Sequence, residues 1–196
     1  MSIAFIICGA LAREVTAIIR QNEWDIDVYG IPAIDHMRPE KIAPDVERKF
    51  LAIRERYDHV LVVYGDCGTR GSLDEFLSRY ALQRLESPHC YEMYGGHQFD
   101  ELMAEEPGTF FLTDFLVRGF RGTIWRGLGL DRFPQLKDDY FRNYRRIVYL
   151  MQTDRPELRA KAAEIAQILE LPLEIRFSGY GLLEKRLSDW VQQHNR

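Results

Sequence analysis

The sequence contains little cysteine and no paired cysteine motif. Three cysteines occur among 196 residues, and no C-x-x-C is present. Zinc fingers and zinc ribbons need such pairs, so both are excluded. An odd number of cysteines without a signal sequence argues against a disulfide framework, so we expect reduced thiols and a cytoplasmic location.

Long apolar runs and an excess of basic residues are also missing. No stretch approaches the ~20 apolar residues that cross a bilayer, and the start M-S-I-A-F-I-I-C lacks the basic residues that open a signal peptide. Acidic side chains (30) outnumber lysine and arginine (26), which gives a net charge of −4. We therefore expect neither a membrane span nor a nucleic-acid partner.

Apolar runs alternate with helical patterns along the chain, and hydrophobic residues make up 46% of it, which is enough for a sizeable core. The patterns predict strands at 3–7, 25–31, 60–64, 146–151 and 173–177, and helices at 11–22, 45–56, 72–80, 156–169 and 181–193. This order predicts an α/β fold with a doubly wound, mostly parallel, Rossmann-like sheet. We expect a single domain over 1–196, with two small lobes (1–85 and 105–196, the Cys90 segment between them) as the alternative.

Two of the cysteines directly follow predicted strands. Cys8 ends the first apolar run, and Cys67 lies in Y-G-D-C-G-T-R-G after the run V-L-V-V-Y. Loops after parallel strands share one edge of a sheet, where ligands bind. If the first and third strands are neighbours, Cys8 and Cys67 lie close together.

The Cys67 loop is rich in glycine but matches no nucleotide-binding motif. Gly-Lys-Ser/Thr is absent, and so is G-x-G-x-x-G. Gly65, Gly68 and Thr69 are candidates to hold a ligand, because glycine permits close backbone approach. We expect loop amides and a helix beginning at the cap Ser72 to lower the pKa of the Cys67 thiol.

The third cysteine, Cys90, lies in P-H-C-Y-E and completes a possible set of three ligands. Neighbouring side chains diverge, so His89 is a candidate acid, base or outer group rather than a second ligand. Asp66 and Arg70 are further candidates for catalysis, whereas Glu14 is expected to be solvated or to cap a helix. Farther along the chain, either Thr113 or Asp114 is expected to cap a helix.

Three hypotheses follow from these residues. In the first, Cys8, Cys67 and Cys90 bind one metal centre, either a [4Fe-4S] cluster with one open iron or zinc with a histidine or water. In the second, the chain is a non-catalytic accessory protein that binds a small ligand or a protein partner, and its cysteines are structural. In the third, Cys67 is a nucleophile and His89 its base.

The motifs I-C-G-A-L-A-R-E, Y-G-D-C-G-T, P-H-C-Y-E and G-T-F-F-L-T-D-F-L-V-R together resemble the bacterial and archaeal family known as domain of unknown function 1638. The resemblance implies cysteines at the positions of Cys8, Cys67 and Cys90. It also implies association with corrinoid proteins and corrinoid-dependent methyltransferases, and hence a role in one-carbon metabolism. The architecture is loosely similar to quinolinate synthase and diphthamide-synthesis enzymes, where three Rossmann-like units each give one cysteine to a cluster.

Overall fold

The chain folds into two compact units, each with its own parallel sheet. The structure is a computed structural model that describes residues 1–194. The first unit comprises residues 1–93 with the described residues from Leu182 onward, and the second comprises Tyr94–Gly181. The sequence-based lobes divided the chain differently, since residues 182–193 were expected to belong with the second lobe.

The first unit is built on a four-stranded parallel sheet in the order β2-β1-β3-β4. Its strands are β1 (Ile3–Cys8), β2 (Ile26–Ile31), β3 (His59–Val63) and β4 (Gln83–Arg84). Every residue of β1 is buried, because β1 lies inside the sheet and is covered on both faces. The chain leaves β1 for β2 on one side and later places β3 on the other, so the strand order reverses at β1. The predicted adjacency of the first and third strands is confirmed.

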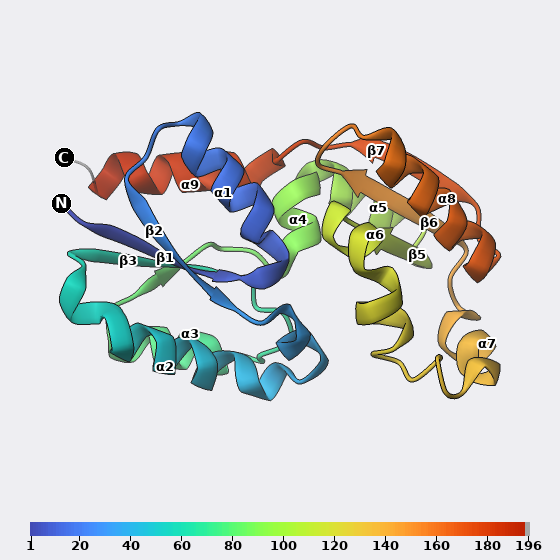
Figure 1. The fold of residues 1–196 in the computed structure, drawn as a ribbon, viewed down its shortest axis with the longest axis horizontal. Coiled ribbons are helices and arrows are strands. Elements are labelled where there is room, and N and C mark those ends of the chain that lie inside the picture. Colours follow the sequence, from blue (N-terminus) through green and yellow to red (C-terminus); the bar gives the residue numbers. More distant parts are fainter. Residues whose placement is uncertain (195–196) are drawn as a thin grey trace. The chain divides into compact units, whose positions relative to one another are not determined.

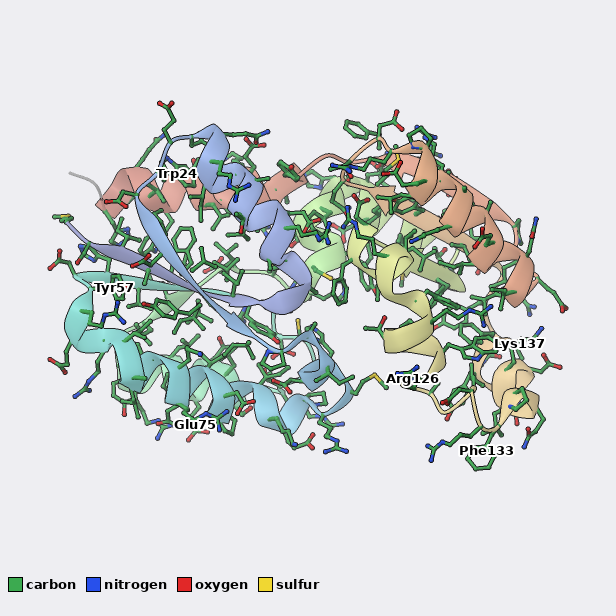
Figure 2. All side chains as sticks on the ribbon, in the orientation of Figure 1. Trp24, Tyr57, Glu75, Arg126, Phe133 and Lys137 are labelled. Atoms are coloured by element: carbon green, nitrogen blue, oxygen red, sulfur yellow. The ribbon has the colours of Figure 1, made fainter. Side chains whose placement is uncertain are left out.

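Helices cover both faces of this sheet. They are α1 (Ala12–Gln21), α2 (Ile42–Ile53), α3 (Ser72–Arg79) and α9 (Gly181–His194), while the short α4 (Cys90–Gly95) follows β4. In Figure 1, α1 and α9 lie on one face, and α2 and α3 lie on the other. Leu73, Phe76 and Leu77 of α3 are buried, whereas Glu75 points outward (Figure 2). This arrangement confirms the doubly wound α/β fold.

The second unit has a three-stranded parallel sheet in the order β5-β6-β7. Its elements are α5 (His97–Glu105), β5 (Thr109–Leu112), α6 (Asp114–Phe120), α7 (Lys137–Phe141), β6 (Arg146–Met151), α8 (Pro156–Leu169) and β7 (Leu173–Phe177). A π-helical turn, Arg121–Trp125, extends α6. Residues such as Leu112, Ile147 and Ala162 form its core between the strands and α8.

A buried carboxylate joins the ends of β5 and β6. Asp114 is fully buried, and its oxygens accept hydrogen bonds from the Tyr149 hydroxyl (2.5 Å), the backbone N–H groups of Gln152 (3.0 Å) and Thr153 (3.1 Å), the Thr153 hydroxyl (2.5 Å) and Arg118 (3.0 Å). Thr113 caps α6, since its side chain accepts from the Leu116 N–H. The cap is therefore Thr113, and Asp114 holds two strand ends together.

Within residues 1–194, no helix combines the length and the apolarity needed to cross a membrane. Short 3₁₀ turns link several of the elements, and one of them, Ala33–Met37, follows the end of β2. Since the loops after parallel strands share one sheet edge, this turn belongs to the same edge as the ends of β1 and β3.

Candidate functional site

Cys8 is the last residue of β1 and is buried. Its sulfur accepts a hydrogen bond from the Ala10 N–H at 3.4 Å, which caps the short turn Gly9–Leu11. The Nδ1 atom of His36 lies 3.9 Å from the same sulfur. The first thiol therefore lies at the strand end that the sequence predicted, with polar groups around it.

Cys67 lies in a loop with an unusual backbone. Cys67 (φ 49°) and Arg70 (φ 54°) adopt the left-handed conformation, as do Gly68 (φ 82°) and Gly71 (φ 87°). Non-glycine residues adopt it at a cost of roughly 1–3 kcal/mol each, and such strain persists only where surrounding structure maintains it. The loop thus holds Cys67 in one orientation at an energetic cost.

Asp66 supplies part of that support. Its carboxylate accepts hydrogen bonds from the Thr69 hydroxyl (2.8 Å) and the Gly68 N–H (3.2 Å), and its carbonyl accepts from the Thr69 N–H (2.9 Å). The Thr69 hydroxyl is the main reason why the pKa of Asp66 lies below its usual value. Asp66, which the sequence offered as a candidate for catalysis, therefore shapes the loop.

The segment after β4 runs alongside the Cys67 loop. The N–H groups of Asp66 and Cys67 donate to the carbonyls of Ser87 (3.0 Å) and Pro88 (2.9 Å). Gly65 makes this approach possible, because a Cβ there would lie 2.9 Å from both Cα and N of His89. Cys90, the first residue of α4, follows directly. The two chain segments therefore bring Cys90 toward Cys67.

The three free thiols lie within electrostatic reach of one another. Burial is the largest cause that raises the pKa of each thiol, and it brings that of Cys67 to about 12. The charge of Cys8 also raises the pKa of Cys67, and the charges of Cys67 and Cys8 raise the pKa of Cys90. The expectation of a lowered Cys67 pKa was wrong. Burial outweighs the loop amides, and α3 begins only at Ser72, capped by Gly71 without a side-chain hydrogen bond.

Buried carboxylates add negative charge around these thiols. Asp35, 7% exposed, raises the pKa values of Cys8 and of Tyr64. Glu14, 3% exposed, raises that of Cys90, so the expectation that Glu14 is solvated was wrong. One nearby cation, Arg84, acts in the opposite direction on Cys67, but its guanidinium also binds Asp74 at 2.5 Å. Asp35 and Glu14 therefore disfavour the thiolate forms of Cys8 and Cys90, whereas Arg84 favours that of Cys67.

The remaining predicted residues lie in the same unit as the three cysteines. The ring of His89 meets Tyr91 edge-on at 5.4 Å between centroids, and the His89 carbonyl accepts from the Ser87 hydroxyl at 2.8 Å. Arg70 is exposed, and Thr69, in the same loop, is buried. Gly65 allows close packing against His89, whereas glycine suits position 68 because the backbone there has a positive φ of 82°. In residues 1–194, as the side chains stand, no three or more His, Cys, Asp or Glu groups are grouped closely enough to hold a metal ion.

Sequence reasoning missed His36 and Tyr64. The two rings stack at 5.7 Å between centroids, with an interplanar angle of 18°. Tyr64 follows Val63, whose register partner is Ile7, so Tyr64 continues β3 beside Cys8. Burial is the main cause that lowers the pKa of His36 and raises that of Tyr64. The rule that identified Cys8 and Cys67, applied to the end of β2, would have identified His36.

Most of the chain matches a known protein family. The family described as "Protein of unknown function (DUF1638)" matches residues 31–187. No curated protein matches the chain, and no solved structure does.

Proposed function

This chain belongs to the DUF1638 family, and we propose that Cys8, Cys67 and Cys90 hold a metal centre, with a [4Fe-4S] cluster as the first candidate and zinc as its rival. The observation that carries the proposal is that three free thiols, Cys8 buried and Cys67 and Cys90 partly buried, lie within electrostatic reach at the edge where the strand order reverses. In open α/β sheets, this edge is where ligands bind.

The charge around the thiols supports a cation. Cys8 raises the pKa of Cys67, and Cys8, Cys67 and the buried Glu14 raise that of Cys90, while the buried Asp35 raises that of Cys8. These thiols therefore ionise readily only beside a positive charge. A metal ion or cluster supplies that charge and deprotonates its thiol ligands. Soft thiolates are the ligands that zinc and iron–sulfur clusters prefer.

The backbone of the Cys67 loop supports the same conclusion. Two non-glycine residues in the left-handed region, Cys67 and Arg70, together cost about 2–6 kcal/mol at ~1–3 kcal/mol each. Loops that carry such strain cluster at ligand sites, where a fixed side-chain orientation is required. Asp66 and Gly65 maintain the loop, the first by hydrogen bonds and the second by its close approach to His89.

When bound, a cluster supplies electron exchange or Lewis acidity, and zinc supplies Lewis acidity alone. Three cysteines leave one coordination position for another donor or for a substrate oxygen. The chain's own residues position the thiolates and limit the access of water. Reduced thiols also suit the cytoplasm. A corrinoid-protein or methyltransferase partner rests on the family resemblance, and the proposed centre does not depend on it.

The alternatives make different use of the same residues. A nucleophilic cysteine needs a thiol whose pKa is lowered, yet the pKa of Cys67 is raised to about 12 by burial. This argues against Cys67 as an attacking group with His89 as its base. An accessory protein with purely structural cysteines would not need the strained Cys67 loop. We therefore rank the metal centre first.

Single Cys→Ser variants test the proposal. Protein purified without oxygen should bind metal, and Cys8→Ser, Cys67→Ser and Cys90→Ser should each lose most of it, because an alcohol is a poor replacement for a thiolate ligand. His97→Ala, in the second unit, is the control and should keep the wild-type metal content. Metal content in the cysteine variants equal to that of wild type would disprove the proposal.

A further inference from the structure

The outer edge of the first sheet is open at β4. This strand ends the order β2-β1-β3-β4, so only one of its two sides is paired. The Leu85 N–H, just beyond the strand, donates to the Val62 carbonyl of β3 at 3.2 Å. Because successive backbone groups of a strand face opposite sides, the N–H and C=O of Arg84 and the N–H of Glu86 face away from β3. None of these three groups has a hydrogen-bond partner among residues 1–194.

A hollow of about 590 Å³ lies at this open edge, entirely within the first unit. Residues 82–86 form part of its lining, and side chains of α3 and α9 form the rest. These two helices lie on opposite faces of the sheet (Figure 1), so the strand is recessed between them. The volume falls within the range of binding pockets, roughly 300–1,000 Å³. The edge is therefore a groove and not a flat surface.

The side chains of β4 already bind the two flanking helices. Gln83 accepts a hydrogen bond from the indole N–H of Trp190 on α9. Arg84 donates from Nε and Nη2 to the carboxylate of Asp74 on α3, at 2.5 and 3.0 Å. These polar side chains are therefore occupied, while the backbone groups of Arg84 and Glu86 remain available. Backbone groups at a sheet edge are what an extended peptide recognises when it adds a strand.

The charges of the hollow favour a basic occupant. Its lining contains three acidic side chains and two arginines. One arginine is paired with Asp74 and the other with Glu92, so neither presents an uncompensated charge. Glu86 is exposed, and Asp189 is paired with the exposed Lys185, a kind of pair that contributes little. Two carboxylates therefore remain for the lysine or arginine side chains of a partner.

We propose that this groove is a docking site for an extended, basic peptide segment of a partner protein, which adds a strand beside β4. The backbone of the segment pairs with the N–H and C=O of Arg84 and the N–H of Glu86, and its basic side chains meet Glu86 and Asp189. Residues 82–86 span about 13 Å at ~3.3 Å per residue, so a segment of about five residues suffices. A second copy of this chain does not fit, because its own β4 is recessed between the same two helices, which would meet first.

The experiment selects peptides from a phage-displayed library of random seven-residue sequences on the full-length chain. Affinities of the enriched peptides are then measured for wild type, Ser78→Trp and Glu75→Trp. Ser78 is exposed and lines the groove, so a tryptophan there should block it. Glu75 lies on the same helix but points outward (Figure 2), which makes Glu75→Trp the matched control. We expect sequences rich in β-branched residues and in lysine or arginine, and a Kd that rises at least tenfold in Ser78→Trp alone.

Two further measurements report the backbone pairing itself. Replacing the peptide's amides by esters, one at a time, removes single N–H donors. Only every second replacement should weaken binding, by about 2–12-fold for the loss of one hydrogen bond, because alternate N–H groups face β4. In hydrogen exchange followed by NMR, the amides of Arg84 and Glu86 should exchange more slowly when the peptide is bound.

Several results would overturn the proposal, whatever the three cysteines bind. A library that yields no enriched sequence, or peptides that bind Ser78→Trp as tightly as wild type, would show that the groove is not a docking site. Enrichment of acidic sequences, or ester effects without a two-residue period, would exclude a basic added strand. A wild-type chain that sediments as a dimer, and as a monomer after Ser78→Trp, would assign the edge to a second copy instead.

Discussion

Gly65→Ala should disturb the candidate site more than any other exchange of comparable size. A Cβ at this position would lie 2.9 Å from Cα and N of His89 and 3.1 Å from C of Pro88. Favourable contacts between carbon atoms lie near ~3.5–4.0 Å, so the two chain segments must separate by about 0.5–1 Å. The atoms in the way belong to the backbone and cannot turn aside as a flexible side chain would.

The magnitude follows from the cost of overpacking. Adding a methyl group to a closely packed site costs typically ~1–3 kcal/mol, and 1 kcal/mol lowers Tm by about 2–4 °C in a chain of this size. We expect Tm to fall by roughly 2–12 °C. The hydrogen bonds from Asp66 and Cys67 to Ser87 and Pro88 should weaken as well, which would move Cys90 away from Cys67 and reduce metal binding.

Gly30→Ala is the matched control. Gly30 lies in β2, and a Cβ there would have no atom within 4 Å. Thermal unfolding followed by circular dichroism, with metal content measured on the same samples, should show Gly30→Ala equal to wild type or slightly more stable, because alanine restricts the unfolded chain. The reasoning is refuted if Gly65→Ala unfolds at the same temperature as Gly30→Ala and retains its metal.

Three more predictions concern the parts of the fold that support the site and the second sheet. Asp114→Ala leaves the buried Tyr149 hydroxyl and the Gln152 N–H without their acceptor and should lower the free energy of unfolding by about 3–5 kcal/mol. Denaturant unfolding measures this loss. A loss below ~1 kcal/mol would contradict the role of Asp114 in holding the two strand ends together. Arg186→Ala removes the paired hydrogen bonds from α9 to Glu92 (2.8 and 2.7 Å) and should destabilise the first unit. Lys185→Ala is the control and should cost less, because the exposed ion pair of Lys185 with Asp189 contributes little. Equal decreases of the denaturation midpoint in the two variants would argue against this role of Arg186. The Ser2 N–H and hydroxyl are the main causes that lower the pKa of Asp58, so the contribution of its carboxylate to stability is present above the unfolded pKa of about 3.9 and is lost as pH falls through the lower folded value. Asp58→Asn should therefore be less stable than wild type at pH 6, and the difference should be much smaller at a pH below the folded pKa. A difference in stability that does not change with pH would exclude this linkage.

The fold could be predicted well from the sequence because its strongest signals are local. Buried parallel strands such as Ile3–Cys8 and Arg146–Met151 are continuous apolar runs, and α8 begins with Pro156 and repeats apolar residues on one face. The adjacency of β1 and β3 follows from the general order of doubly wound sheets. What the sequence could not supply was the return of α9 to the first unit, since that depends on packing between residues far apart in the chain.

The candidate site was predictable only in part. Cys8 and Cys67 follow strands directly, so a general rule locates them, and the thiols do lie within electrostatic reach of each other. Their pKa values depend on burial by many residues, which no local motif encodes, and the prediction for Cys67 therefore had the wrong sign. His36 lies five residues beyond the end of β2, in a turn whose side chains show no pattern of their own.

Iron and acid-labile sulfide measured together on wild-type protein, purified without oxygen, test the central claim most directly. The account predicts both in near-equal amounts, with broad thiolate-to-iron absorption near ~400 nm. Zinc in their place would keep the three-cysteine centre and exclude the cluster. Protein that contains neither metal, and takes up neither when supplied with iron and sulfide or with zinc, would contradict the account.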